Sequence, residues 1–147
     1  MNSLRAVVFF SIITGSLFVT GCASVPMASA ERDTQAKSFT VDAAKSNIYI
    51  YRNESIGGAI KMPVVIDGKM AGDTAAKTYL LANVDPGEHT IISKAETDSS
   101  LKMTTVPGKN YFVWQEVKMG MWMARSQLHE VDEATGKGAV AECKLIE

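Results

Sequence analysis

The stretch TYLLANVDPGEHTIISKA, residues 78–95, consists of two short apolar runs joined by Asp-Pro-Gly-Glu at 85–88. In the second run His89, Ile91 and Ser93 alternate with their neighbours, and successive side chains of a strand point to opposite faces. Proline suits the second position of a type II turn and glycine the third. The stretch therefore predicts two β-strands with a tight turn between them.

The same pattern of residues continues along the chain from Asn47 onward, where short runs of β-branched and aromatic residues are separated by Gly, Pro and Asp. Two further turns lie between such runs, Asp67-Gly68 and Val-Pro-Gly-Lys at 106–109. We expect a mainly β domain over 46–147, an antiparallel β-sandwich of about seven strands or a small barrel, with the turns favouring a meander. The expected strands are NIYIYR, AIKMPVVI, KTYLLANV, EHTIISKA, LKMTTV, NYFVWQEVK and MWMARSQLHEV.

The C-terminal stretch VDEATGKGAVAECKLIE has a different pattern. Asp132 is a suitable helix N-cap, and the acidic Glu133 would lie in the first turn. Gly136 and Gly138 each cost such a helix about 1 kcal/mol relative to alanine. We expect a short helix around 132–143, followed by a strand-like tail.

The N-terminal residues 1–21 have the features of a secretory signal: a single charge at Arg5, an apolar middle and small residues at the end. The apolar run is too short and too polar for a permanent transmembrane helix. Its end resembles a bacterial lipoprotein signal, in which Val19, Thr20 and Gly21 precede the obligatory Cys22.

That resemblance implies that Cys22 carries a diacylglyceryl thioether and, after cleavage, an N-acyl chain such as palmitate. Two or three acyl chains anchor a protein stably, whereas one does so only marginally. Ala23, in place of the aspartate that favours inner-membrane retention, implies the periplasmic leaflet of the outer membrane of a Gram-negative cell. Residues 22–45 lack periodicity and are expected to form the lipidated N-terminus and a flexible tether, with Phe39 and Val41 as its candidates for docking.

The balance of charged residues and the number of cysteines exclude some classes of partner and some bonding states. The chain has 15 Lys and Arg residues, of which Arg5 would be removed, against 16 Asp and Glu. This near-balance argues against a nucleic-acid partner. If Cys22 is alkylated it cannot form a disulfide, so Cys143 is expected to be a free thiol packed in the core rather than a reactive nucleophile, with an intermolecular bridge as the remaining alternative.

Long segments of the chain resemble the bacterial lipoprotein family known as domain of unknown function 2846. The resemblance rests on NIYIYRNESIGGAIKMPVVIDGK, TYLLANVDPGEHTI, PGKNYFVWQEV and LHEVDEATGKGAVAECKL, and extends over most of residues 37–145. The stretch IDGKMAG followed by VDPGEHTI is also similar to PEGA-type β-sandwich repeats. These resemblances imply an immunoglobulin-like or prealbumin-like sandwich on a lipid tether, and they imply no activity.

Catalytic and metal motifs are absent from the sequence. The two histidines, His89 and His129, are forty positions apart, and neither lies near a zinc-binding cluster. Nothing in the chain matches a nucleophile elbow or a phosphate-binding loop. We therefore expect no enzymatic activity, no metal, and no cofactor other than the acyl chains on Cys22.

The stretch MGMWMARSQLH, residues 119–129, suggests the candidate contact residues Met121, Trp122, Met123 and His129. On one strand Met119, Met121, Met123 and His129 would share a face, and thioethers with an imidazole suit Cu(I). A turn at Gly120 would break that register. Core packing or a hydrophobic patch for a partner are the alternatives, because methionine serves both.

The expected function is that of a non-catalytic binding or envelope-support module, tied to the membrane and contacting an envelope protein or a cell-wall component. The alternative is a periplasmic small-molecule or Cu(I) carrier that uses Met121, Met123 and His129. Four aromatic residues on the strands are open to two interpretations, a peptide or glycan contact or a second core face: Tyr49, Tyr51, Tyr111 and Trp114.

Overall fold

The computed structural model of the chain describes residues 24–147. The predicted signal peptide 1–21, including Val19, Thr20 and Gly21, and the predicted lipidation site Cys22 lie outside these residues. The elements are α1 (Ala30–Ala36), β1 (Ser46–Arg52), β2 (Met62–Ile66), β3 (Lys69–Thr74), β4 (Thr78–Val84), β5 (Gly87–Ser93), β6 (Ser99–Thr105), β7 (Lys109–Lys118), β8 (Arg125–Val131), α2 (Glu133–Ala141) and β9 (Lys144–Leu145).

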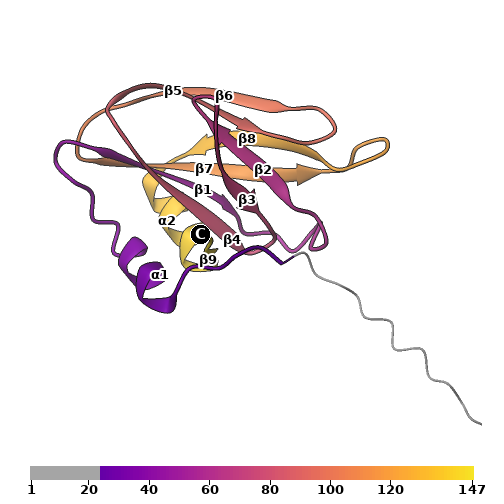
Figure 1. Cartoon of the computed structure of the whole chain (residues 1–147), viewed down its shortest axis with the longest axis horizontal. Helices are drawn as coiled ribbons and strands as arrows, with labels where there is room; N and C mark the ends of the chain where they lie inside the picture. The colour runs from indigo at the N-terminus through magenta and orange to yellow at the C-terminus, as the bar shows by residue number, and fades with distance from the viewer. Residues whose placement is uncertain (1–23) are drawn as a thin grey trace, which may run out of the picture.

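In the described part of the chain the nine strands form two sheets, ordered β8-β7-β1-β4-β9 and β3-β2-β5-β6 (Figure 1). The predicted mainly β sandwich with a short C-terminal helix is confirmed, and each of the seven expected strands is present. Two strands were not among them. β3 has the Gly- and Ala-containing sequence KMAGDT, in which only Thr74 is buried, so it carries no alternating apolar signal. β9 is the strand-like tail.

The predicted meander is wrong, because two of the three turns connect the two sheets. Asp67 and Gly68 both have positive φ, 49° and 78°, and they close the β2–β3 hairpin as expected. The Pro-Gly segments after β4 and β6 instead lead from one sheet into the other. Proline and glycine set the local bend of the chain, and that bend does not specify which strand the next segment pairs with.

The sheet pairing also departs from the expected antiparallel pattern. β1 pairs with β7 in parallel, from Ser46 opposite Lys109 to Tyr51 opposite Trp114, and β4 pairs with β9 in parallel. The remaining pairs between named strands are antiparallel. Parallel neighbours require a long connection, and here the chain crosses the second sheet between β1 and β7.

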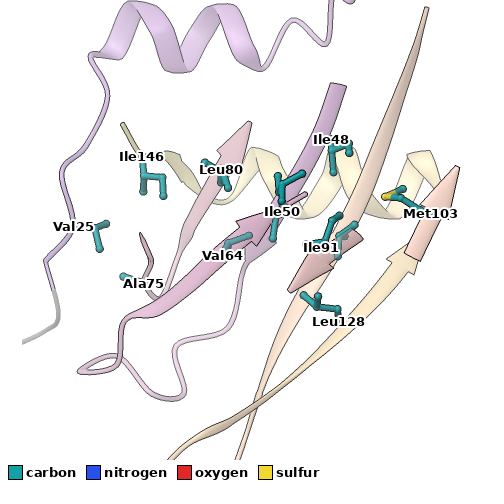
Figure 2. Packing of buried hydrophobic residues seen from close by; sticks show 12 residues of the cluster. Val25, Ile48, Ile50, Val64, Ala75, Leu80, Ile91, Met103, Leu128 and Ile146 are labelled. Atoms are coloured by element: carbon teal, nitrogen blue, oxygen red, sulfur yellow. The ribbon is translucent and has the colours of Figure 1, made fainter. Parts of the chain in front are cut away.

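Strand β1 is buried along its whole length because both of its faces are covered. Ile48 and Ile50 point into the core between the two sheets, which Figure 2 shows together with their neighbours. The other members shown in this inter-sheet core include Val64, Leu80, Ile91, Met103, Leu128 and Ile146.

Tyr49 and Tyr51, on the opposite face of β1, belong to a second core beneath the helices. The Tyr49 ring stacks on Phe112 at 5.0 Å between centroids. Of the two interpretations of the strand aromatics, a second core face is therefore correct for Tyr49 and Tyr51. Cys143 is buried in the same core, as predicted; its thiol donates to the Arg52 carbonyl, and burial raises its pKa to about 12.

Helix α2 closes the second core and begins as predicted. The Asp132 carboxylate accepts a hydrogen bond from the Thr135 N–H at 2.9 Å. Gly136 faces β7, where a Cβ would overlap the ring of Phe112, whereas a Cβ on Gly138 would meet nothing within 4 Å. One of the two glycines thus has a packing reason that the sequence pattern does not reveal.

Residues 24–45 differ from the expected flexible tether, because they are packed on the sandwich. The Val25 side chain is buried and lies near Ala75 at the edge of the inter-sheet core (Figure 2). The Glu147 N–H donates to the Pro26 carbonyl, and α1 is held by Asp33, whose carboxylate accepts from the Tyr79 hydroxyl and the Leu145 N–H. Small and polar residues dock here through hydrogen bonds to the last strand, and hydrophobic periodicity does not detect such contacts. Within the described residues no helix combines the length and apolar character needed to cross a bilayer.

Candidate functional site

Of the six large apolar side chains in the described residues that are at least 65% exposed, five lie at one end of the sandwich, and the sixth, Met70, lies on β3. We call this group the apolar tip; it consists of Ile56, Met119, Met121, Trp122 and Met123, each at least 65% exposed. Four members lie in the β7–β8 loop, and Ile56 lies in the loop 53–61 between β1 and β2. Contiguous exposed apolar residues mark interaction surfaces, whereas a single exposed one needs no explanation.

The β7–β8 loop is held in one shape by Glu96, which lies between β5 and β6. Its Oε2 accepts from the N–H groups of Met123 at 2.8 Å and Trp122 at 3.0 Å, and its Oε1 accepts from Arg125 at 3.0 Å. These bonds, led by those from Met123 and Trp122, lower the pKa of Glu96 to about 2. The apolar side chains are therefore presented by an ordered loop.

Gly120 makes this tight loop possible. A Cβ at this position would overlap the Met123 carbonyl oxygen and the Glu96 carboxylate. Met119 therefore precedes the β7–β8 turn and is not part of β8. The single strand that would place Met119 on one face with Met121, Met123 and His129 is not formed.

The neighbouring loop 53–61 is fastened by two charged residues. Glu54 accepts from the Trp114 indole at 3.0 Å and from the Val117 N–H at 2.9 Å. Arg52, which is fully buried, donates to the carbonyls of Ile60 at 2.9 Å and Gly57 at 3.4 Å. Burial lowers the pKa of Arg52, and Glu54 opposes that effect.

The two fastened loops border a shallow groove lined by Ala59, Ile60, Lys61 and residues 119–124. Its apolar character comes from thioethers, an indole and aliphatic side chains. Such groups bind by removing apolar surface from water, and Lys61 adds one basic side chain to the lining. The groove is suited to contact.

The structure separates the residues proposed for Cu(I). Met121 and Met123 line the groove, but His129 lies on β8, where its Nε2 is 2.8 Å from Glu116 and its ring stacks on Trp114. The expected cluster of two thioethers and this imidazole is therefore not assembled. Within the described residues, no three His, Cys, Asp or Glu side chains lie together as a metal site.

The other histidine, His89, lies at the opposite end of the sandwich. Its Nδ1 is 2.6 Å from Asp67 Oδ2, and its Nε2 donates to the Asp85 carbonyl at 2.8 Å. Burial acts to lower the pKa of His89, but the bonds to Asp67 and Asp85 outweigh it and raise the pKa above its ordinary value. His89 thus fastens the β2–β3 turn to β5.

Sequence reasoning named Met121, Trp122 and Met123 as contact candidates and considered Met119 with them, and it missed Ile56 and the supporting Glu96. Glu96 is 25 to 27 residues from the N–H groups that it binds. The only local signal is that the β7–β8 loop contains no carboxylate of its own to accept from those groups.

Comparison with known proteins places this architecture in a family. Residues 42–127, more than half of the chain, match the family described as "Protein of unknown function (DUF2846)". The chain belongs to the DUF2846 family. An uncharacterized protein of Haemophilus influenzae is 37% identical over 137 residues, covering 92% of this chain and 82% of that protein. No solved structure matches the chain.

The DUF2846 match is shorter than the range 37–145 traced by resemblance. It includes β1 to β7, the loop 53–61, Glu96 and the whole β7–β8 loop, and it ends within β8. The apolar tip and the residues that hold it therefore lie inside the family domain, whereas α1, α2 and β9 lie outside the match.

Replacing Glu96 by alanine is expected to loosen the β7–β8 loop without unfolding the sandwich. The N–H groups of Met121, Trp122 and Met123 lose their acceptor, so their amide hydrogens should exchange faster while those of β1 stay protected. In the wild-type chain this protection should persist in mild acid, because the pKa of Glu96 is lowered. Its stabilising effect on the loop is fully present above about pH 4.5 and is lost only as the pH falls toward about 2, where the carboxylate is protonated.

Hydrogen exchange followed by NMR measures both effects. Glu88→Ala removes an exposed glutamate of β5 and serves as the matched control. Unchanged exchange at 121–123 in the Glu96→Ala chain would show that the carboxylate does not order the loop.

Proposed function

We propose that this DUF2846 protein is a lipoprotein anchored by acyl chains on Cys22 in the periplasmic leaflet of the outer membrane. Its sandwich is a non-catalytic module that contacts another component of the cell envelope through the apolar tip. The observation that carries the second part is the combination of order and exposure at the tip: Glu96 and Gly120 hold a loop whose methionines and tryptophan face solvent. A preordered apolar loop loses little conformational entropy on binding.

The anchor is supported by the sequence around Cys22 and by the fold that begins directly after it. Val25 is only three residues from Cys22 and is already packed in the inter-sheet core. A signal segment ending at Gly21 would leave a folded domain directly attached to its lipid. The near-balance of charge agrees with attachment through acyl chains rather than through a basic surface.

Replacing Cys22 by serine is expected to abolish acylation and to release the protein from the membrane. The thiol is the group that forms the diacylglyceryl thioether, and without acyl chains the membrane affinity falls by about 0.8 kcal/mol for each buried methylene lost. Incorporation of labelled fatty acid and flotation of the envelope fraction measure the two effects.

Cys143→Ala is the matched control, because it removes the other cysteine, which is buried in the second core. This variant should still be labelled and should still float with membranes. Full labelling and flotation of the Cys22→Ser chain would show that the lipoprotein assignment is wrong.

A further inference from the structure

The register of the strands places four connections at one end of the sandwich. Arg52 lies opposite Thr78, Met62 opposite Thr74, Ser93 opposite Ser99 and Lys118 opposite Arg125. β1 and β7 are parallel, so they finish at the same end. The loops 53–61, 75–77, 94–98 and 119–124 therefore share this end, which lies on the right in Figure 1.

The described chain begins at the same end. Ser24 and Val25 border a pocket that is also lined by Ala75, Ala76 and Lys77, the residues between β3 and β4. Figure 1 likewise shows the first described residues at the right-hand end, below the β7–β8 loop. The start of the domain and the apolar tip thus lie at the same end of the sandwich.

The distance from the lipidation site to this end is short. One residue spans at most about 3.6 Å, so Cys22 lies within about 7 Å of Ser24 along the chain. Four strand spacings separate β9 from β8 across this sheet, and Met27, which pairs with Ile146 just after β9, lies about one spacing further. The start of the domain and the β7–β8 loop are therefore about 24 Å apart across the end of the sandwich. An anchor at Cys22 would leave this end of the sandwich, to which the apolar tip belongs, facing the membrane and within reach of it.

The side chains of the tip are suited to that location. Tryptophan favours the boundary between headgroups and acyl chains, where its ring is apolar and its N–H remains hydrated. Methionine and isoleucine gain by leaving water. Near the tip Arg125 is paired with Glu96 and Lys118 with Glu116, and Lys61 in the groove adds one positive charge. Contact of the loop with a bilayer would therefore depend on its apolar side chains more than on attraction to anionic lipid.

We infer that the envelope component contacted by the apolar tip is the lipid bilayer that holds the anchor. Trp122, Met121 and their neighbours enter the headgroup region beside the acyl chains, and the sandwich rests on the membrane at the end where β7 and β8 meet. This inference depends on the proposed acylation of Cys22. It replaces the expected stand-off tether with a domain held at the membrane by two contacts.

Fluorescence of the two tryptophans tests the inference in the full acylated protein. The protein is reconstituted into vesicles of phosphatidylethanolamine and phosphatidylglycerol whose acyl chains are brominated near the headgroup. The Trp114→Phe variant reports Trp122 alone, and Trp122→Phe reports Trp114 alone, which is partly buried and bonded to Glu54. We expect a blue shift and a loss of intensity for Trp122 and little change for Trp114.

Flotation of the same vesicles separates the two proposals. If the protein floats but Trp122 is neither shifted nor quenched, the tip does not enter the bilayer, while the anchor stands. If the protein does not float, the anchor itself is wrong. If Trp114→Phe fails to fold, subtracting the Trp122→Phe signal from that of the wild-type chain yields the contribution of Trp122.

A protein partner is the competing occupant of the tip. A photoreactive amino acid in place of Trp122, activated in intact cells, should form covalent crosslinks to lipid. No discrete crosslinked product with a second protein is expected. A reproducible crosslink to one envelope protein would assign the tip to that protein and overturn the inference.

Discussion

Replacing Gly136 by alanine is expected to destabilise the protein by about 2–3 kcal/mol, although alanine is the better helix former. Gly136 lies on the face of α2 that packs on β7, where a Cβ would overlap Phe112. Phe112 cannot move aside, because its ring is stacked on Tyr49 in the second core. The helix would have to lift from the sheet, and the covered aromatic surface would be partly exposed. Urea unfolding followed by circular dichroism measures the change in the free energy of unfolding.

The same helix offers a matched control two residues away. A Cβ at Gly138 would meet nothing within 4 Å, so Gly138→Ala should raise the free energy of unfolding by about 0.5–1 kcal/mol through helix propensity alone. Effects of opposite sign at the two positions are expected. Equal effects would show that α2 does not approach β7 through Gly136.

Replacing Arg52 by alanine is expected to cost about 2–5 kcal/mol, the range for truncating a large core side chain. Arg52 is fully buried, and its loss would leave a cavity between the sheets and the loop 53–61. The carbonyls of Ile60, Gly57 and Thr74 would also lose the donor that they share. We further expect faster amide exchange in the loop 53–61, because the guanidinium fastens it to β1. Thermal unfolding and hydrogen exchange give the two readouts.

Two variants separate the possible causes. Arg32→Ala removes an exposed arginine of α1 and should change stability by less than about 0.5 kcal/mol. Arg52→Met keeps most of the side-chain volume and removes the buried charge, so it should be more stable than Arg52→Ala while still loosening the loop 53–61. Wild-type exchange in the loop of both Arg52 variants would show that its carbonyls do not depend on the guanidinium.

The strands were predictable because their signal is local. The alternation of Ile and Tyr in NIYIYR requires two faces, and both are buried in the structure, Ile48 between the sheets and Tyr49 beneath α2. The helix at Asp132 and the hairpin at Asp67-Gly68 were predictable for the same reason, since capping and positive φ depend on residues a few positions apart.

Of the contacts of the N-terminal segment, the docking of Phe39 was predictable, because it is a large apolar residue in a polar stretch, and it packs against Tyr49 and Phe112 in the second core. The other contacts of this segment and the support of the tip were not predictable. Val25 and α1 are held by hydrogen bonds and packing against β9, at the other end of the chain. Glu96 reaches a loop more than twenty residues away. In each case the partner is distant in sequence, and the residues involved carry no periodic pattern that would indicate it.

By itself the sequence determined the β-rich class, the strand segments, the C-terminal helix and the resemblance to the DUF2846 family. Each of these depends on alternation, capping or motif, all of which act over a few residues. Only the tertiary structure decided that β1 pairs with β7 in parallel, that the Pro-Gly segments join two sheets, and that the start of the domain and the apolar tip share one end. The physical reason is that strand pairing and burial depend on which distant segments exclude water together, and local residue pattern does not specify that choice.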